Sequence, residues 1–392
     1  MLGLLTLSLG AAAQTSTSDE WQVKTLVKSG AAVTEADNLN DAIIYTTGVK
    51  TPTLSLVSKD GDYKELYVTS QDNIIGKVDL NAGTFKKVIE DKTIKGNNGA
   101  CFSLDGDTLI YTIDNGQWWS TGKLCSKYTL RSENFQNVYD YANGVGAYGP
   151  AYNPMDKSVY YSSWGNTGLF KVVYNAANGH HEGKRLFNAR TKDGNTRIAI
   201  HPTGKYIYIF SRGYMYRSTY NEGTNTYNTP TLFAGKDNET GYKDGNGLDA
   251  RFCFEKAYGV FVKNPLYDKS DDEYDFYVTD TENHCIRKVT PSGEVSLFAG
   301  TPKAKGGEDG NVLTASFNMP TGIAYDEETQ TFYVADCNGI RTITNGNATG
   351  ISTLDYKPQT AERSVIYNLA GQRVGKNYKG IVIENGKKII KK

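Results

Sequence analysis

The chain carries one long stretch twice, and this repetition decides the fold. Residues 232–262 read LFAGKDNETGYKDGNGLDARFCFEKAYGVFV, and residues 297–326 read LFAGTPKAKGGEDGNVLTASFNMPTGIAYD. Each block leads into a second matching segment, YVTDTENHCIRKVT at 277–290 and YVADCNGIRTIT at 333–344. The LFAG motifs start 65 residues apart and the YVTD and YVAD motifs 56 apart. A longer acidic turn in the first copy, NPLYDKSDDEYD, explains the difference, so the two blocks are copies of one structural unit.

Fainter copies of this unit precede the two clear ones. The shared template is an alternating apolar strand, a turn, a second alternating strand and a polar loop. Four upstream segments fit it: LSLVSKDGDYKELYVTS (54–70), ACFSLDGDTLIYTID (100–114), PAYNPMDKSVYYSS (150–163) and IAIHPTGKYIYIF (198–210). Each of the six units continues with a third strand, such as LFKVVYN or CIRKVT, and most with a fourth, such as TFKKVIE or TLFAG.

Four short antiparallel strands cannot bury both of their faces alone. Stacking six such units around an axis buries the faces and protects the sheet edges. The sequence therefore predicts an all-β fold, a six-bladed β-propeller with four-stranded blades over residues 14–350.

The two clear blocks resemble the blades of NHL-repeat propellers, whose pattern is DG…ARF…P.GI…YVAD..NH.IRK…G.V…LAG. The resemblance is specific over residues 232–344 and degenerate before them. It implies that the segment ENHCIRK is family scaffold, with Asn283 and His284 in the loop between second and third strands and Ile286 pointing inward. We expect no metal at His284, because His201, His180 and His181 fall in turns on the opposite face.

Composition narrows the class of partner. Lys+Arg and Asp+Glu balance at 43 each, so no global field would concentrate nucleic acid or an anionic bilayer. We expect a monomer with no nucleic-acid partner, no membrane span and no cofactor. The five cysteines show no C-x-x-C spacing and are interpreted mostly as small core residues, with their disulfide state left open.

The N-terminal segment MLGLLTLSLGAAAQTS is typical of a secretory signal peptide. Its apolar run is too short to span a bilayer and ends in Ala11, Ala12 and Ala13, which fit a cleavage site. It lacks a positive n-region, which leaves open a truncated signal that starts upstream of Met1. As a signal peptide, residues 1–13 are removed, and the protein is secreted or displayed on the outer cell surface. The alternative is that this segment forms a buried N-terminal strand.

The sixth unit, ending at GIRTITNGNATG, lacks a fourth strand of its own. The segment WQVKTLVKSG (21–30) resembles EVSLFAG and directly precedes the first unit, so it can supply that strand and close the ring. The competing segment is ISTLDY at 351–356.

Residues 351–392 form a linker and a small β tail. The segment RSVIYNLAGQRVGKNYKGIVIENGKKIIKK alternates strands with a Gly turn and an Asn-Gly hairpin. It resembles the C-terminal sorting tails of secreted Bacteroidetes proteins, which implies recognition by type IX secretion. The alternative is a solvated basic tail that packs on the propeller.

Catalytic motifs are absent from the sequence: no G-x-S-x-G, H-E-x-x-H, Walker loop or EF-hand occurs. A propeller lactonase would need a cluster of carboxylates and amides around a central metal. Asp114, Asp280 and Asp336 do end second strands. Other units carry Ser at this place, and we interpret the aspartates as caps of loop amides. An enzyme is thus the less favoured class, with a metal-dependent propeller hydrolase or lactonase as the alternative function.

Aromatic and polar residues gather in the loops between the second and third strands of three neighbouring units. Such loops emerge on one face together with the loops that join successive blades. Exposed aromatics beside amides suit sugar rings, although packing between blades is the alternative. The sequence predicts a non-catalytic module that binds glycan or protein on this face. Its candidate site residues are Trp118, Trp119, Trp164, Asn166, Arg212 and Tyr214.

Overall fold

The computed structural model divides the chain into two compact units, Met1–Gly350 and Ile351–Lys392. Within them it describes residues 21–28, 53–59, 63–69, 74–80, 83–90, 96–102, 108–114, 126–129, 134–136, 147–163, 168–177, 179–188, 196–267, 272–346, 366–368, 380–384 and 387–391.

Six antiparallel sheets make up the described part of the first unit. Each of five sheets consists of strands that are consecutive in the sequence. The first sheet contains β2 (Thr53–Lys59), β3 (Tyr63–Thr69), β4 (Ile74–Asp79) and β5 (Thr84–Glu90), and the second contains β6 (Gly96–Phe102), β7 (Thr108–Asp114), β8 (Ser126–Thr129) and β9 (Asn134–Gln136). The third contains β10 (Ala147–Asn153), β11 (Ser158–Ser163), β12 (Gly168–Asn175) and β13 (His180–Asn188). The fourth contains β14 (Arg197–Ile200), β15 (Tyr206–Ser211), β16 (Tyr214–Asn221), β17 (Thr226–Tyr227) and β18 (Thr231–Gly235), and the fifth contains β19 (Gly245–Asn246), β20 (Gly259–Lys263), β21 (Tyr274–Asp280), β22 (Cys285–Val289) and β23 (Glu294–Ala299).

The sixth sheet joins the two ends of the first unit. Its strand order is β24 (Gly310–Asn311), β1 (Trp21–Lys28), β27 (Gly339–Asn345), β26 (Thr331–Asp336) and β25 (Ile323–Asp326). β1 pairs antiparallel with β27, with Val23 opposite Ile343 and Lys28 opposite Gly339. The prediction that the N-terminal segment supplies the missing strand is confirmed; the competing segment 351–356 lies outside the described residues.

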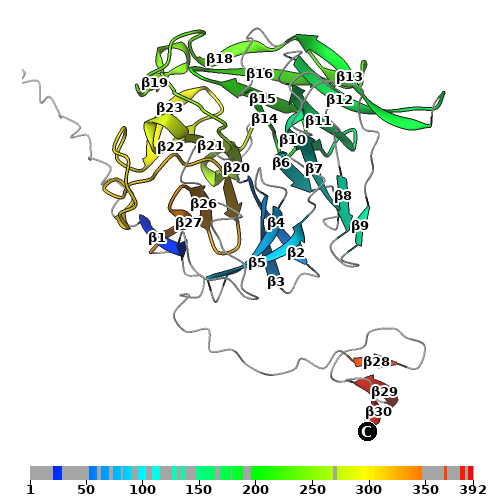
Figure 1. Cartoon of the computed structure of the whole chain (residues 1–392). Helices are drawn as coiled ribbons and strands as arrows, with labels where there is room; N and C mark the ends of the chain where they lie inside the picture. Colours follow the sequence, from blue (N-terminus) through cyan, green and yellow to red (C-terminus); the bar gives the residue numbers. More distant parts are fainter. Residues whose placement is uncertain are drawn as a thin grey trace, which may run out of the picture. The chain divides into compact units, whose positions relative to one another are not determined.

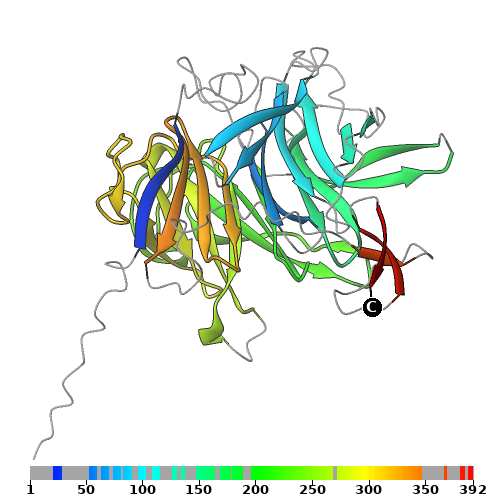
Figure 2. The same ribbon diagram turned by 90° about the horizontal axis from the view of Figure 1, so that it is seen from below.

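The sheets follow one another around a centre (Figure 1). Their first strands contact in sequence: β2 with β6, β6 with β10, β10 with β14, β20 with β25, and β25 with β2. The sheets of β14 and β20 are joined by a buried cluster that includes Phe210, Phe254 and Phe276. Figure 2 shows the same sheets from below, with β1 beside the last strands of the unit. The fold is all-β and propeller-like, as the sequence predicts.

Two short strands cover outer edges that the sequence pattern leaves open. β19 pairs with β23, and β24 pairs with β1, so the loop that enters each of these sheets runs along its outermost long strand. The two strands begin 65 residues apart, at the same place of the repeat. They satisfy backbone groups that an exposed edge would leave unpaired.

The second unit contains one three-stranded antiparallel sheet among its described residues: β28 (Ile366–Asn368), β29 (Gly380–Glu384) and β30 (Lys387–Lys391). Glu384 pairs with Lys387, so β29 and β30 form a hairpin. This is the hairpin predicted from the Asn-Gly dipeptide.

Candidate functional site

The structure describes two of the six predicted site residues. Trp118 and Trp119 lie between β7 and β8, and Trp164 and Asn166 lie between β11 and β12, outside the described residues. Arg212 and Tyr214 belong to the connection between β15 and β16 and to the start of β16.

Arg212 lies in a tight turn at the end of β15. It is exposed and adopts a left-handed conformation, with φ at 45°. Its carbonyl oxygen accepts a 2.6 Å hydrogen bond from the backbone amide of Phe254. This bond fixes the turn of one sheet against the loop that enters the next sheet at β20. Arg212 is therefore placed where two neighbouring sheets present their loops.

Tyr214 does not present its ring to solvent. It is 3 % exposed and packs edge-on against Tyr216, with ring centroids 5.3 Å apart. The expected exposed platform is therefore absent at this position. Tyr214 instead forms one wall of a pocket.

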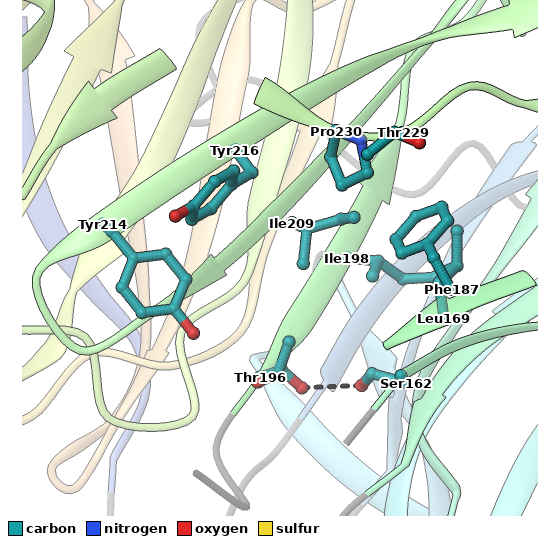
Figure 3. A pocket seen from close by; sticks show the side chains of 11 residues that line it. Ser162, Leu169, Phe187, Thr196, Ile198, Ile209, Tyr214, Tyr216, Thr229 and Pro230 are labelled. Atoms are coloured by element: carbon teal, nitrogen blue, oxygen red, sulfur yellow. Dashed lines mark hydrogen bonds between the residues drawn. The ribbon is translucent and has the colours of Figure 1, made fainter. Parts of the chain in front are cut away.

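The pocket lies between the sheet of β10–β13 and the sheet of β14–β18. Its volume is about 60 Å³. Ser162, Gly168, Leu169 and Phe187 come from the first sheet, and Thr196, Ile198, Ile209, Tyr214, Tyr216, Thr229 and Pro230 come from the second. Figure 3 shows aliphatic and aromatic side chains around most of the pocket, with Ser162, Thr196 and the Tyr214 hydroxyl at one end and Thr229 beside Pro230 at the other. Such a mixture of apolar walls and few polar groups is typical of small-molecule sites.

Hydrogen bonds hold the polar groups of the pocket in place. The Ser162 hydroxyl donates to the carbonyl oxygen of Thr196 at 2.7 Å and so ties the two sheets together (Figure 3). The Tyr216 hydroxyl donates to Asp237 at 2.7 Å. Both Ser162 and Thr196 are buried, so the polar end of the pocket is built into the fold.

A polar cluster fastens the same two sheets at the other end of β11 and β16. Lys171 lies 2.8 Å from Asp156, and the hydroxyls of Tyr160 and Tyr220 donate to that carboxylate at 2.5 and 3.1 Å. Burial raises the pKa of the Tyr220 phenol to about 12, and it raises the pKa of Tyr160 further. The phenols stay neutral donors, and the cluster closes this end of the seam between the sheets.

The aspartates that end second strands cap loop amides, as predicted. Asp280 accepts a 2.7 Å hydrogen bond from the backbone amide of Cys253, and Asp336 accepts one at 3.0 Å from that of Asn318. Burial raises the pKa of Asp336 to about 6 and also raises that of Asp280. The side chain of Asp114 lies outside the described residues.

Two buried arginines complete these aspartate sites, and sequence reasoning missed them. Arg287 lies 3.0 Å from Asp280 and 2.5 Å from Asp244, and Arg341 lies 3.6 Å from Asp336 and 2.5 Å from Asp309. Both guanidinium groups are fully buried. One sequence pattern could have identified them: each aspartate and each arginine recurs at the same place in the two copies of the repeat. The repetition indicates a scaffold element of the blade.

His284 also has a scaffold role. It ends a short 3-10 helix, Thr281–Asn283, and its Nδ1 atom accepts a 3.0 Å hydrogen bond from the backbone amide of Met319. Burial lowers the pKa of its imidazole. Within the described ranges, no group of three or more His, Cys, Asp or Glu side chains could hold a metal ion. Cys253, Cys285 and Cys337 carry free thiols.

Comparisons with known proteins match this architecture to proteins from Bacteroides. No protein-family model matches the chain. An auxiliary nutrient binding protein from Bacteroides ovatus is 27% identical, with a TM-score of 0.67 over 83% of this chain and 76% of that one. The one from Bacteroides thetaiotaomicron is 27% identical, with a TM-score of 0.66 over 82% and 76%. A third protein, from B. thetaiotaomicron and described as a candidate phosphatase, is 26% identical, with a TM-score of 0.68 over 83% of this chain and 78% of that one.

A curated relative matches part of the chain. Protein SUPPRESSOR OF QUENCHING 1, chloroplastic, from Arabidopsis thaliana is 35% identical over 121 residues, which are 30% of this chain. The chain spans only about a tenth of that relative's length. Of the residues that the structure describes, none form a helix long and apolar enough to cross a membrane.

Proposed function

We propose that this protein is an extracytoplasmic, six-bladed NHL-like propeller that binds a nutrient ligand without transforming it. The observation that carries the proposal is the similarity, at 27% identity and over about four fifths of this chain, to two Bacteroides proteins named as auxiliary nutrient binding proteins. Identity at this level together with a matching fold supports a shared binding role.

The ligand of this proposal is a glycan, and it binds to the face that carries the loops between second and third strands. Four candidate residues, Trp118, Trp119, Trp164 and Asn166, supply stacking surfaces and an amide to sugar rings. Arg212 and Tyr214 extend the site. Two facts support this location: Tyr214 lines the pocket between two sheets, and Trp164 follows β11 two residues after Ser162, another pocket residue. A protein ligand is the second form of the same proposal.

The proposal also includes export of the protein from the cytoplasm. Residues 1–13 act as the signal peptide, and residues 351–392 act as a linker and sorting tail that brings the propeller to the outer surface. The separate small sheet formed by β28, β29 and β30 supports a tail that is recognised as a unit. At the cell surface, a propeller with an aromatic loop face would hold nutrient glycans close to the cell.

A glycan array tests the proposed function. The protein lacking residues 1–13 is labelled and applied to plant, host and microbial glycans, with a pull-down from the growth medium as the arm for protein ligands. We expect reproducible binding to a narrow set of glycans. Binding to no glycan and to no protein would contradict the proposal.

Hydrolysis is the second candidate function, because one of the similar structures is described as a candidate phosphatase. A hydrolase of this fold would use a metal on the axis of the ring. Incubation with p-nitrophenyl phosphate and with lactones, each with Ca²⁺, Mg²⁺, Mn²⁺ or Zn²⁺, separates the two functions. The binding proposal predicts no turnover above the rate in buffer.

A further inference from the structure

The pocket between the sheets of β10–β13 and β14–β18 has two ends of different chemistry. Ser162, Thr196 and the phenol oxygen of Tyr214 lie at one end. Phe187, Ile198 and Pro230 lie toward the other, where the exposed Thr229 is the one polar side chain (Figure 3). A group that fills the pocket must therefore have a polar part and an apolar part. The apolar part faces the aliphatic end, because burial of apolar surface there is favourable.

The lining of the pocket excludes charged ligand groups. Of the described residues that line the pocket, none carries a charged side chain. A carboxylate, sulfate or ammonium group would lose its hydration without a countercharge, which costs far more than the burial of an uncharged group. The pocket therefore selects an uncharged group.

Size excludes whole sugar rings. The volume of about 60 Å³ has room for roughly four water molecules. A substituent of a few heavy atoms fits this space, and a pyranose ring with its hydroxyls does not. The ring of the ligand stays outside the pocket, at the end where Ser162 and Tyr214 lie and where the loops that follow β11 and β15 emerge.

We propose that this pocket binds the acetamido group of an N-acetylated amino sugar. The proposal rests on the proposed function and names the class of glycan. The acetamido methyl lies against Ile198 and Ile209, and the amide faces the hydroxyls of Ser162 and Tyr214. An acetamido group is uncharged, has only four heavy atoms and is polar at one end, so it matches the pocket in charge, size and polarity.

Other common substituents match the pocket less well. The hydroxymethyl group of a neutral hexose would place a hydroxyl among aliphatic side chains, and an unsatisfied buried hydroxyl costs more than a satisfied one contributes. The methyl group of a 6-deoxy sugar suits the apolar end and leaves the hydroxyl end without a ligand partner. The acetamido group uses both ends.

A matched pair of disaccharides tests the proposal by isothermal titration calorimetry. N,N′-diacetylchitobiose and cellobiose share their linkage and ring configuration and differ in the acetamido groups. We expect the protein lacking residues 1–13 to bind diacetylchitobiose at least about tenfold more tightly than cellobiose. Fucose serves as the probe for a methyl group without an amide and should bind more weakly than N-acetylglucosamine.

A matched pair of variants locates the acetamido contact. Tyr214→Phe removes the phenol oxygen that faces the pocket and keeps the ring. Tyr220→Phe makes the same change in the same strand, at the opposite end of the seam, where the hydroxyl bonds Asp156. We expect Tyr214→Phe to weaken diacetylchitobiose binding about threefold to tenfold, with no change for Tyr220→Phe. Thermal melting shows that both variants are folded.

Three results would overturn this proposal. Equal affinity for the two disaccharides would show that the acetamido group is not recognised, and unchanged affinity in Tyr214→Phe would show that it binds elsewhere. Absence of binding to either disaccharide also overturns it. The proposed function is judged separately, by whether the array gives any other glycan or a protein ligand.

Discussion

At the scale of single residues, two buried arginines hold loops against their sheets. Arg287 and Arg341 are fully buried, and each joins two aspartates and two backbone carbonyls from the loop that enters its sheet. A buried ion pair of this kind gives little net stability over an apolar replacement, but loss of one partner leaves the other charge buried and unpaired. The arginines therefore act as fixed points for two loops.

Replacement of Arg341 by Met tests this role. We expect the free energy of unfolding in urea to fall by about 3–5 kcal/mol, because buried Asp336 loses its charge partner and the carbonyl groups of Glu308 and Ser316 lose a donor. The control is Arg185→Met, since Arg185 is exposed and its loss should change stability by less than about 0.5 kcal/mol. A similar small change in both variants would show that the buried arginine is dispensable.

Asp336 makes the stability depend on pH. Its folded-state pKa of about 6 lies above the ordinary value of 3.8 because of burial. The folded protein then binds a proton more tightly than the unfolded chain, so this carboxyl contributes stability below about pH 4 that is lost as the pH rises through 6. Between pH 6.5 and 4.5 we expect the wild type to gain stability relative to Asp336→Asn, measured by urea unfolding at each pH. If the free energy of unfolding of the wild type minus that of Asp336→Asn falls or stays constant as the pH is lowered, the raised pKa is contradicted.

At the scale of elements, the pairing of β1 with β27 depends on one glycine. Gly339 has φ at +141°, and a Cβ atom there would lie 1.9 Å from the carbonyl oxygen of Val27. No side chain fits without a shift of the backbone. β27 can therefore pair with β1 only with glycine at this position.

Gly339→Ala should separate the two strands at this end and lower the free energy of unfolding by more than about 2 kcal/mol. The matched control is Gly241→Ala, where the added Cβ would meet only the Cβ of Arg251 at 3.7 Å, an ordinary contact. Chemical denaturation of the two variants makes the comparison. If Gly339→Ala is as stable as Gly241→Ala, the close approach of β1 and β27 is wrong.

The elements also show what the sequence can and cannot predict. The alternation of apolar and polar residues predicts where the long strands lie. It does not predict that some of them are buried on both faces, such as β26, in which all six residues are buried. The two-residue strands β19 and β24 are too short for any period, and they form because a neighbouring edge offers hydrogen bonds. Likewise, Arg287 meets Asp244 across 43 residues, and the pocket depends on how two sheets pack. Of the predicted site residues, Tyr214 lines this pocket with a buried ring, where the sequence predicts an exposed one.

At the scale of the whole molecule, β1, the first of the described strands, pairs with β27 and so completes the sheet formed by the last strands of the first unit. β1 lies between β27 and β24 and buries Val23 and Val27 almost completely. Each of these side chains contributes about 1.5–3 kcal/mol by burial. The propeller-like unit therefore depends on residues that directly follow the proposed signal peptide.

Deletion of residues 14–30 should destabilise the whole unit, because β27 and β24 both lose their partner. We expect the melting temperature to fall by at least about 10 °C. Removal of residues 351–392, which form a separate compact unit, should leave the main transition nearly unchanged. The opposite result, a stable N-terminal deletion and an unstable C-terminal one, would contradict the closure by β1.

The central claim is that the loop face of the propeller binds a glycan through its aromatic residues. The most direct measurement is titration calorimetry with the best glycan from the array, for the wild type, Trp119→Ala and Trp164→Ala, with thermal melting of each. We predict that each replacement weakens binding by about 1–3 kcal/mol, roughly 5- to 150-fold, while the melting temperature changes by no more than a few degrees. Unchanged affinity, or a large fall in melting temperature that shows the rings to be packed between sheets, would contradict the claim.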